Sequence, residues 1–152
     1  MITRTVVVAG AIFIGALADV TVDAQQHAKP VAAVRPDRAA IKPLASIKEL
    51  MQALSIPMSE AVFKAGAEAP KDDAGWAQLR KHALALAETA NLLLMDGRAP
   101  DTGDWTRLTL AQRDAAMTAV KAIDAHDGDA LSNASDALYE TCDNCHNKYM
   151  KK

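Results

Sequence analysis

The chain has few aromatic residues and no long runs of valine, isoleucine and threonine beyond its N-terminus. Phenylalanine, tryptophan and tyrosine together make up 4% of its 152 residues, while half of all residues are hydrophobic. β-Sandwiches are rich in β-branched and aromatic side chains, so this composition argues against one. Alanine and leucine dominate instead. The sequence therefore predicts a single all-α domain with a proper hydrophobic core.

Blocks of like charge are missing, and cysteine is scarce. The net charge is -2, and no run of five or more charges of one sign occurs, so we expect no nucleic-acid partner. The two cysteines, Cys142 and Cys145, lie three residues apart near the C-terminus. This spacing suits haem attachment, a redox dithiol or half of a metal site.

Residues 1–24 are predicted to be a signal peptide. Arg4 supplies the positive charge, an apolar stretch follows from Val6 to Ala18, and Val22-Asp23-Ala24 offers small residues for cleavage. The apolar stretch is short for a membrane span. We therefore expect export to the periplasm and no membrane association after cleavage. An uncleaved anchor or a buried helix is the alternative.

Residues 25–44 contain three prolines among alanines and charges, which predicts an extended leader. Residues 45–152 are expected to form the folded domain. Ser46, followed by Glu49 three residues later, predicts a capping box at the start of a first helix. Pro57 should kink this helix, because proline removes a backbone donor and clashes with the preceding turn.

Three further helices are predicted from apolar residues at spacings of three and four. The second contains Trp76, Leu79, Ala83, Leu86, Ala90 and Leu93; the third runs from about Trp105 or Leu110 to Ala125 with Met117, Val120 and Ile123 inward; the fourth begins near Asp129 and places Leu131, Ala134, Leu138, Cys142 and Cys145 on one stripe. Short connections favour an antiparallel up-down-up-down four-helix bundle. The two cysteines should then lie beside the start of the first helix, the end of the second and the start of the third.

The segment Cys142-Asp143-Asn144-Cys145-His146 has the pattern Cys-x-x-Cys-His. In c-type haem attachment, two thiols one helical turn apart form thioethers and the adjacent histidine becomes an iron ligand. A redox dithiol is expected beside a strand in a βαβ unit, and zinc needs further ligands at suitable spacing. Covalent haem is therefore the main prediction, and a dithiol or a metal site remains the alternative.

The chain resembles the cytochrome c prime superfamily over residues 45–152. The matching residues are Cys142, Cys145 and His146, Tyr149 three residues beyond the histidine, and Met51 early in the first helix. The resemblance implies an exported four-helix bundle with one haem c, and thus one iron, per chain, and members often form homodimers through their first two helices. Where members often have an arginine after the aromatic residue, this chain has Met150, Lys151 and Lys152.

Met51 is predicted to be the distal iron ligand. In an antiparallel bundle it should lie level with the cysteine turn, and the resemblance points to the same residue. Met58 lies two turns deeper, about 10 Å along the helix, and Met95 is a weaker candidate. The alternative role of Met51 is that of a flexible core residue that fills a gap.

The predicted function is one-electron transfer between redox partner proteins of unknown identity, without catalysis of a bond change. The alternative is a binding protein that captures nitric oxide or carbon monoxide at an open or displaceable distal site. A peroxidase needs distal acid-base groups, whereas the expected distal neighbours Ile47, Leu50 and Leu54 are apolar. Lys148, Lys151 and Lys152 are expected near the haem edge; a solvated tail is the commoner role of such a terminal lysine cluster, and steering of an acidic partner is the alternative.

Overall fold

The structure, a computed structural model, describes residues 42–150. Its helices are α1 (Ile47–Leu50), the π-helical turn η2 (Met51–Ser55), α2 (Ile56–Ala67), α3 (Asp73–Leu93), α4 (Asp104–Asp124) and α5 (Gly128–Tyr149), and no strand forms within the described range. The predicted signal peptide and nearly all of the predicted leader lie outside the described residues. No helix in residues 42–150 is long and apolar enough to cross a membrane.

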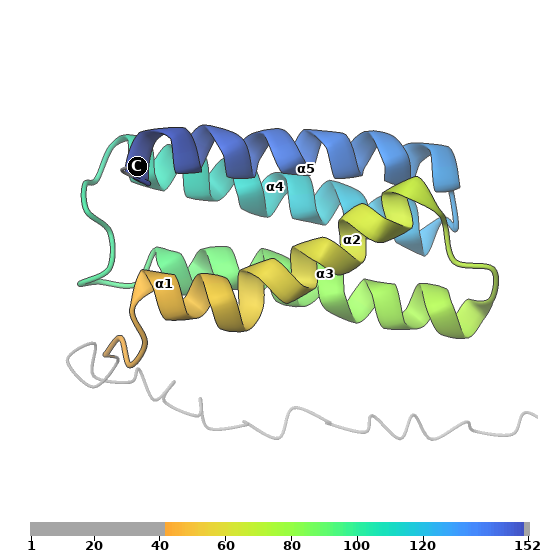
Figure 1. Ribbon diagram of the computed structural model, residues 1–152, viewed down its shortest axis with the longest axis horizontal. Helices are drawn as coiled ribbons and strands as arrows, with labels where there is room; N and C mark the ends of the chain where they lie inside the picture. The colour runs from red at the N-terminus through yellow and green to blue at the C-terminus, as the bar shows by residue number, and fades with distance from the viewer. Residues whose placement is uncertain (1–41, 151–152) are drawn as a thin grey trace, which may run out of the picture. The chain divides into compact units, whose positions relative to one another are not determined.

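The helices form a four-helix bundle. α1, η2 and α2 are continuous, and together they make one bent helix (Figure 1). α2 packs against α3 and α5, and α4 packs against the same two helices from the other side. Successive helices run in opposite directions (Figure 1). The prediction of an all-α, up-down-up-down bundle is therefore confirmed.

The core follows the predicted stripes of apolar residues, with one exception. The six α3 residues predicted to face inward are all buried, as are Val120 and Ile123 of α4. The prediction for Met117 was wrong, because its side chain is 37% exposed. Ala116 is fully buried at the adjacent position, and neighbouring helical residues point about 100° apart. Ala116 therefore takes the inward position and Met117 faces outward.

A small second core cluster closes the end of the bundle where α5 ends. Leu50 of α1, Leu93 of α3 and Trp105 of α4 are buried together there, and Cys145 and Tyr149 of α5 pack against them. This is the meeting of helix ends that the antiparallel topology predicts. It brings the cysteine turn close to the start of the first helix.

The first helix begins at the predicted capping box. The Glu49 amide donates to Ser46 Oγ at 3.2 Å, and the Ser46 amide donates to Glu49 Oε2 at 2.8 Å. Two backbone donors that have no partner within the helix are satisfied in this way, so the box fixes where the helix starts. The position of Met51 along the bundle depends on this start.

The predicted effect of Pro57 takes the form of a π-helical turn. The Ile56 amide donates to the Met51 carbonyl five residues back, and Pro57 follows in the first turn of α2. Proline cannot donate a hydrogen bond and its ring crowds the carbonyl four residues back. A widened turn before Pro57 relieves this crowding, and such turns rotate the residues that follow.

α2 and α5 approach closely at one end and diverge toward the other. A Cβ atom added at Gly66 would lie 2.5 Å from Ser135 Cβ, so only glycine allows this crossing. The start of α2 and the end of α5 do not have such a close contact, and both line a cavity there. The crossing thus sets the place of the candidate site.

Candidate functional site

The cavity lies inside the bundle near the end of α5 and has a volume of about 220 Å³. Its walls come from η2 and α2, from α3, from α4 and from the last turns of α5. The lining residues are mostly apolar, and the cysteine motif forms one wall. The remaining functional side chains on the walls are Met51, Ser55, Ser59, Thr109, Gln112 and Thr141.

The α5 wall carries both cysteines and His146. Cys142 and Cys145 are free thiols, half-buried, and His146 is exposed at the edge of the same cavity. The apolar stripe of Leu131 and Leu138 continues into the two cysteines. The three predicted motif residues therefore face one cavity.

Burial disfavours ionisation of the two thiols. Burial raises the pKa of the Cys142 thiol, and burial also raises the pKa of Cys145, with the neighbouring Cys142 adding to the effect. Redox-active dithiols instead need a lowered pKa, because the thiolate is the nucleophile. The surroundings of Cys142 and Cys145 thus argue against a redox dithiol.

Met51 lies on the wall contributed by the first helix. It is half-buried, packs against the cluster around Leu50 and Trp105, and lines the cavity together with Cys145. Among the methionines of the described range, no other lines the cavity. Met58 packs against the main core, and Met95 accepts a hydrogen bond from Arg98 Nη1 at 3.2 Å. The expected depth match between Met51 and the cysteine turn is present.

The other predicted neighbours of the distal side require a correction. Ile47, Leu50 and Leu54 belong to the end cluster and do not line the cavity, whereas Ser55 and Ser59 do. The widened turn η2 explains the difference, because it places Met51, Ser55, Ser59 and Phe63 on one face at intervals of four. That interval is visible in the sequence and could have revealed the two serines.

Polar side chains on α4 also reach the cavity. Thr109 and Gln112 are buried, and Gln112 Nε2 donates to the Leu86 carbonyl at 3.4 Å. The spacing of apolar residues does not predict either residue, because both are polar. They lie three residues apart, with Trp105 one turn before them and Ala116 one turn after, on the inward stripe of α4.

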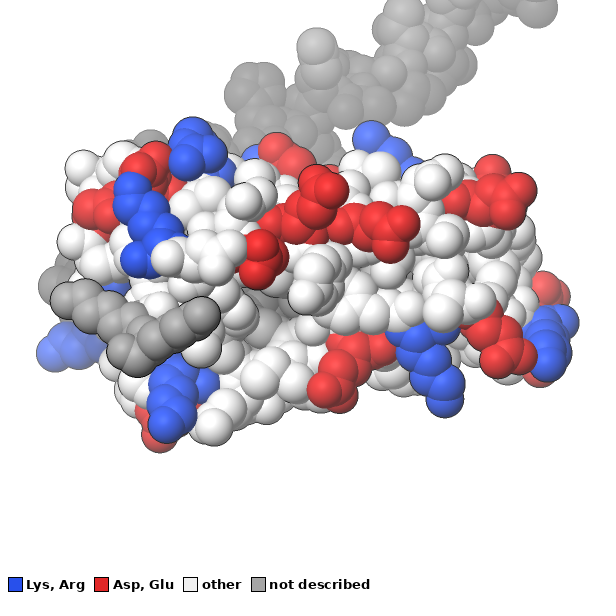
Figure 2. Space-filling view, turned by 45° about the horizontal axis from the view of Figure 1, so that its top comes forward, with Lys and Arg blue, Asp and Glu red and all other residues white. Residues whose placement is uncertain are grey.

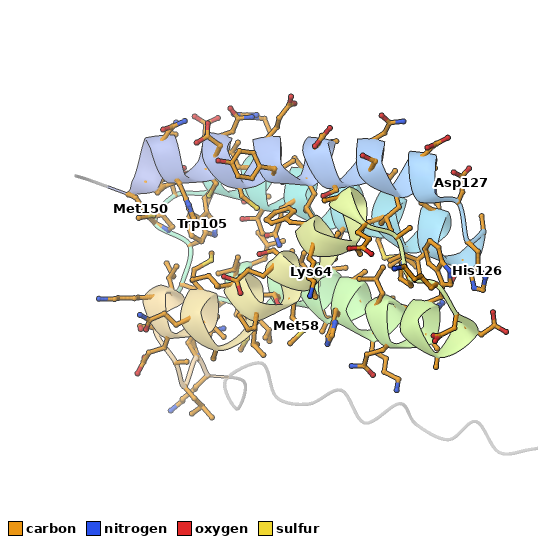
Figure 3. All side chains as sticks on the ribbon, turned by 45° about the vertical axis from the view of Figure 1, so that its right-hand side comes forward. Met58, Lys64, Trp105, His126, Asp127 and Met150 are labelled. Atoms are coloured by element: carbon orange, nitrogen blue, oxygen red, sulfur yellow. The ribbon has the colours of Figure 1, made fainter. Side chains whose placement is uncertain are left out.

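The end of α5 is fastened to the loop between α3 and α4. Tyr149 Oη donates to Asp101 Oδ2 at 2.5 Å, and the Tyr149 ring meets the Trp105 ring edge-on at 5.1 Å between centroids. Trp105 Nε1 in turn donates to the Leu93 carbonyl at 3.0 Å. In Figure 3, Trp105 lies beside Met150 at this end of the bundle, and His126 lies at the opposite end. These contacts hold the turn that carries His146.

Hydrogen bonds to a carboxylate and an ion pair stabilise this attachment. Hydrogen bonds from Tyr149 and from the Trp105 amide lower the pKa of Asp101. Burial, followed by the hydrogen bond to Asp101, raises the pKa of Tyr149 to about 12. Lys148 pairs with Asp104 of α4. Lys148 is thus paired on the α4 side of the bundle, and Lys151 and Lys152 lie outside the described residues.

The outer surface beside the cavity is acidic. Asp136, Glu140 and Asp143 are exposed on α5, and Figure 2 shows acidic side chains across this face, with the surface hollowed beside them. Ile56 and Tyr139 also line the cavity and are 46% and 60% exposed. The mouth of the cavity therefore combines apolar and acidic side chains.

Comparison with known proteins adds no assignment. The chain matches no family model, and neither the curated proteins nor the solved structures gave a match. In the described part of the chain, no three His, Cys, Asp or Glu side chains are grouped so that they could hold a metal ion. What the site can do must be argued from its own residues.

Proposed function

We propose that this protein is a c-type cytochrome that carries single electrons, with one haem bonded covalently to Cys142 and Cys145. The observation that supports the proposal most strongly is that both thiols, His146 and Met51 line the same mostly apolar cavity. These four residues provide two thiols for thioether bonds and two candidate iron ligands. The family resemblance of the motif supports the same assignment.

The donor set of the cavity fits a haem. The half-buried thiols lie one helical turn apart, as thioether bonds to two vinyl groups require, and the imidazole of His146 and the thioether of Met51 would be the axial ligands. When bound, the haem supplies an iron that changes between its ferric and ferrous states. The chain holds the group in a fixed position, keeps water away from most of it and sets its potential through the axial sulfur.

Several side chains have supporting roles in this proposal. Trp105 and Leu93 keep the end of α5 against the bundle, and the Tyr149 contact with Asp101 fixes the turn on which His146 lies. Phe63 and Tyr139, whose rings meet edge-on at 5.8 Å, cover one side of the cavity. The proposed electron path is through the exposed edge of the cavity to a redox partner. Catalysis of a bond change is not part of the proposal.

Export to the periplasm belongs to the same proposal. The support is the signal-like sequence of residues 1–24, with Arg4 before an apolar stretch. Binding of nitric oxide or carbon monoxide is the second candidate function, and the buried hydroxyls of Ser55 and Thr109 favour it, because they bring hydrogen-bonding groups to the cavity wall.

Intact mass measurement after acid-acetone extraction tests the covalent bond. The protein, matured in a strain with haem-attachment machinery, should keep its colour in the precipitate and show the mass of the polypeptide plus one haem. The variant Cys142→Ala/Cys145→Ala should show the polypeptide mass alone. His146→Ala is the matched control, since it should keep the bonded haem while its Soret band moves. A wild-type mass equal to the bare polypeptide would contradict the proposal.

A further inference from the structure

Two buried hydroxyl groups on the cavity wall have no hydrogen-bond partner within the described structure. They are Ser55 Oγ and Thr109 Oγ1, in side chains that are 8% and 2% exposed. The other serine and threonine side chains that line the cavity have partners: Ser59 Oγ donates to the Ile56 carbonyl at 3.1 Å and Thr141 Oγ1 to the Leu138 carbonyl at 2.7 Å. Ser55 and Thr109 are therefore exceptions among the hydroxyl groups of the cavity lining.

Their unpaired state is unusual because helices offer acceptors nearby. Thr89 and Thr118 lie in helices of the same bundle and donate to carbonyls four residues back, at 2.8 and 3.0 Å. Serine and threonine commonly turn back onto the helix in this way. Buried polar groups without a partner are costly and rare in folded proteins. The two free hydroxyls thus point to a ligand that is bound in the cavity.

Ser55 lies on the same side of the cavity as Met51. It follows Met51 by four residues on the face that η2 creates, and α5 with His146 forms a different wall. Thr109 reaches the cavity from α4. With a haem held by the α5 wall, the face of the haem turned toward Met51 is also the face nearest Ser55.

The charge of the cavity selects the kind of ligand. Its lining includes no lysine or arginine, and the one carboxylate, Asp143, is negative. An anion would find only hydroxyl and amide dipoles and a repelling charge. A small neutral molecule with a hydrogen-bond acceptor atom suits this wall better.

We propose that the unpartnered hydroxyls of Ser55 and Thr109 are polar binding points on the cavity wall for a small neutral molecule with an acceptor atom. The ligand is a water molecule when Met51 is coordinated, and a diatomic gas when Met51 is displaced. The proposal rests on the proposed haem function and deepens it. It gives the cavity a means to stabilise a bound gas that an apolar distal wall lacks.

The infrared spectrum of the carbon monoxide complex tests the subsite. A hydrogen bond from the protein lowers the C–O stretching frequency and slows dissociation of the gas. In reduced Met51→Ala protein, which removes the competing sulfur, the further changes Ser55→Ala and Thr109→Val should each raise that frequency. Each should speed dissociation about fivefold, the factor that corresponds to one ordinary hydrogen bond.

Ser59→Ala is the matched control, because Ser59 lines the same cavity but its hydroxyl already bonds the Ile56 carbonyl. It should leave frequency and rate unchanged. Thr109→Ser keeps the hydroxyl and should give the same C–O frequency and dissociation rate as the parent. This variant tests the role of Thr109 if Thr109→Val does not fold. Exchange into heavy water should shift the frequency of the parent, of Ser59→Ala and of Thr109→Ser, but not that of a variant that combines Ser55→Ala with Thr109→Val.

The outcomes separate the two proposals. A haem protein whose carbon monoxide spectrum and dissociation rate ignore both Ser55→Ala and Thr109→Val overturns the subsite and leaves the proposed function intact. Equal shifts for Ser59→Ala would also overturn it, since a general change of polarity would then explain the effect. A protein that carries no covalent haem by mass overturns the proposed function and the subsite together.

Discussion

Met51 and His146 supply different chemistry to the two sides of one cavity. A thioether sulfur is a soft, neutral donor that favours ferrous iron, whereas an imidazole is a stronger donor. Coordination by Met51 would therefore raise the reduction potential and close the iron to gases. Met51 is also half-buried and packs against the cluster that contains Leu50. This contact limits how far its side chain can move away from the cavity.

Met51→Ala should convert the protein from a low-spin to a high-spin form, because it removes the sixth ligand without changing the α5 wall. The potential should fall and carbon monoxide should bind faster. Absorption spectra, a redox titration and stopped-flow mixing measure the three effects. Met58→Ala is the control, since Met58 packs against the main core. If Met58→Ala or Met95→Ala produced the change instead, the assignment of Met51 would be wrong.

The sequence predicted four residues that the structure brings to one cavity, but not the polar residues beside them. Cys142, Cys145 and His146 form a contiguous motif, and Met51 could be placed by counting residues from the end of an antiparallel bundle. Thr109 carries no such signature, and the interval of four between Met51 and Ser55 does not by itself show that this face points inward. A serine on a helix most often faces solvent or bonds its own backbone, and only the path of η2 turns Ser55 inward.

At the scale of the elements, the end of α5 depends on a loop that is distant in sequence. Tyr149 and Lys148 reach Asp101 and Asp104 near the start of α4. Because His146 is one turn before Tyr149, a change in this attachment would move the proposed iron ligand. The attachment also makes this end of the bundle sensitive to pH, through two groups whose pKa values shift in opposite directions.

Tyr149→Phe should lower the melting temperature by an amount that depends on pH. The pKa of Asp101 is lowered from 3.8, so its contribution is present above that value and is lost as the pH falls through its folded pKa. The pKa of Tyr149 is raised from 10.0 to about 12, so its contribution is present below 10 and is lost as the pH rises toward 12. The difference from wild type should therefore be constant between these limits and shrink beyond them.

Thermal unfolding followed by circular dichroism measures this difference. Tyr139→Phe is the matched control, because Tyr139 is on the same helix and is 60% exposed. It should leave the melting temperature unchanged. A Tyr149→Phe variant as stable as wild type near neutral pH would show that the hydrogen bond to Asp101 does not hold the end of α5.

Most elements could be predicted because their signals are local. Each pattern involves residues that are close together in one helix. Examples are the capping box of Ser46 and Glu49 and the apolar spacing from Trp76 to Leu93. The extent of η2 could not be predicted, since proline can be accommodated by a kink, a break or a widened turn. Which of these occurs depends on packing against α3 and on the crossing of α2 over α5.

At the scale of the whole molecule, the site is a consequence of helix divergence. Gly66 and Ser135 bring α2 and α5 into contact at one end, so the two helices separate toward the end where Met51 and Cys145 lie. The bundle topology followed from the short connections between helices. The close crossing of α2 and α5 could not be predicted. It depends on the absence of a Cβ atom at one residue, and the sequence does not show which residue of the other helix faces that position.

The absorption spectrum of the purified, oxidised protein, from the Soret region to the near infrared, tests the account most directly. Histidine and methionine coordination predicts a low-spin Soret band together with the weak near-infrared band that arises from charge transfer between methionine sulfur and ferric iron. This band should be absent in Met51→Ala and present in Met58→Ala. A high-spin spectrum of the wild-type protein would contradict Met51 ligation and favour gas binding, and a protein without any Soret band would contradict the haem assignment itself.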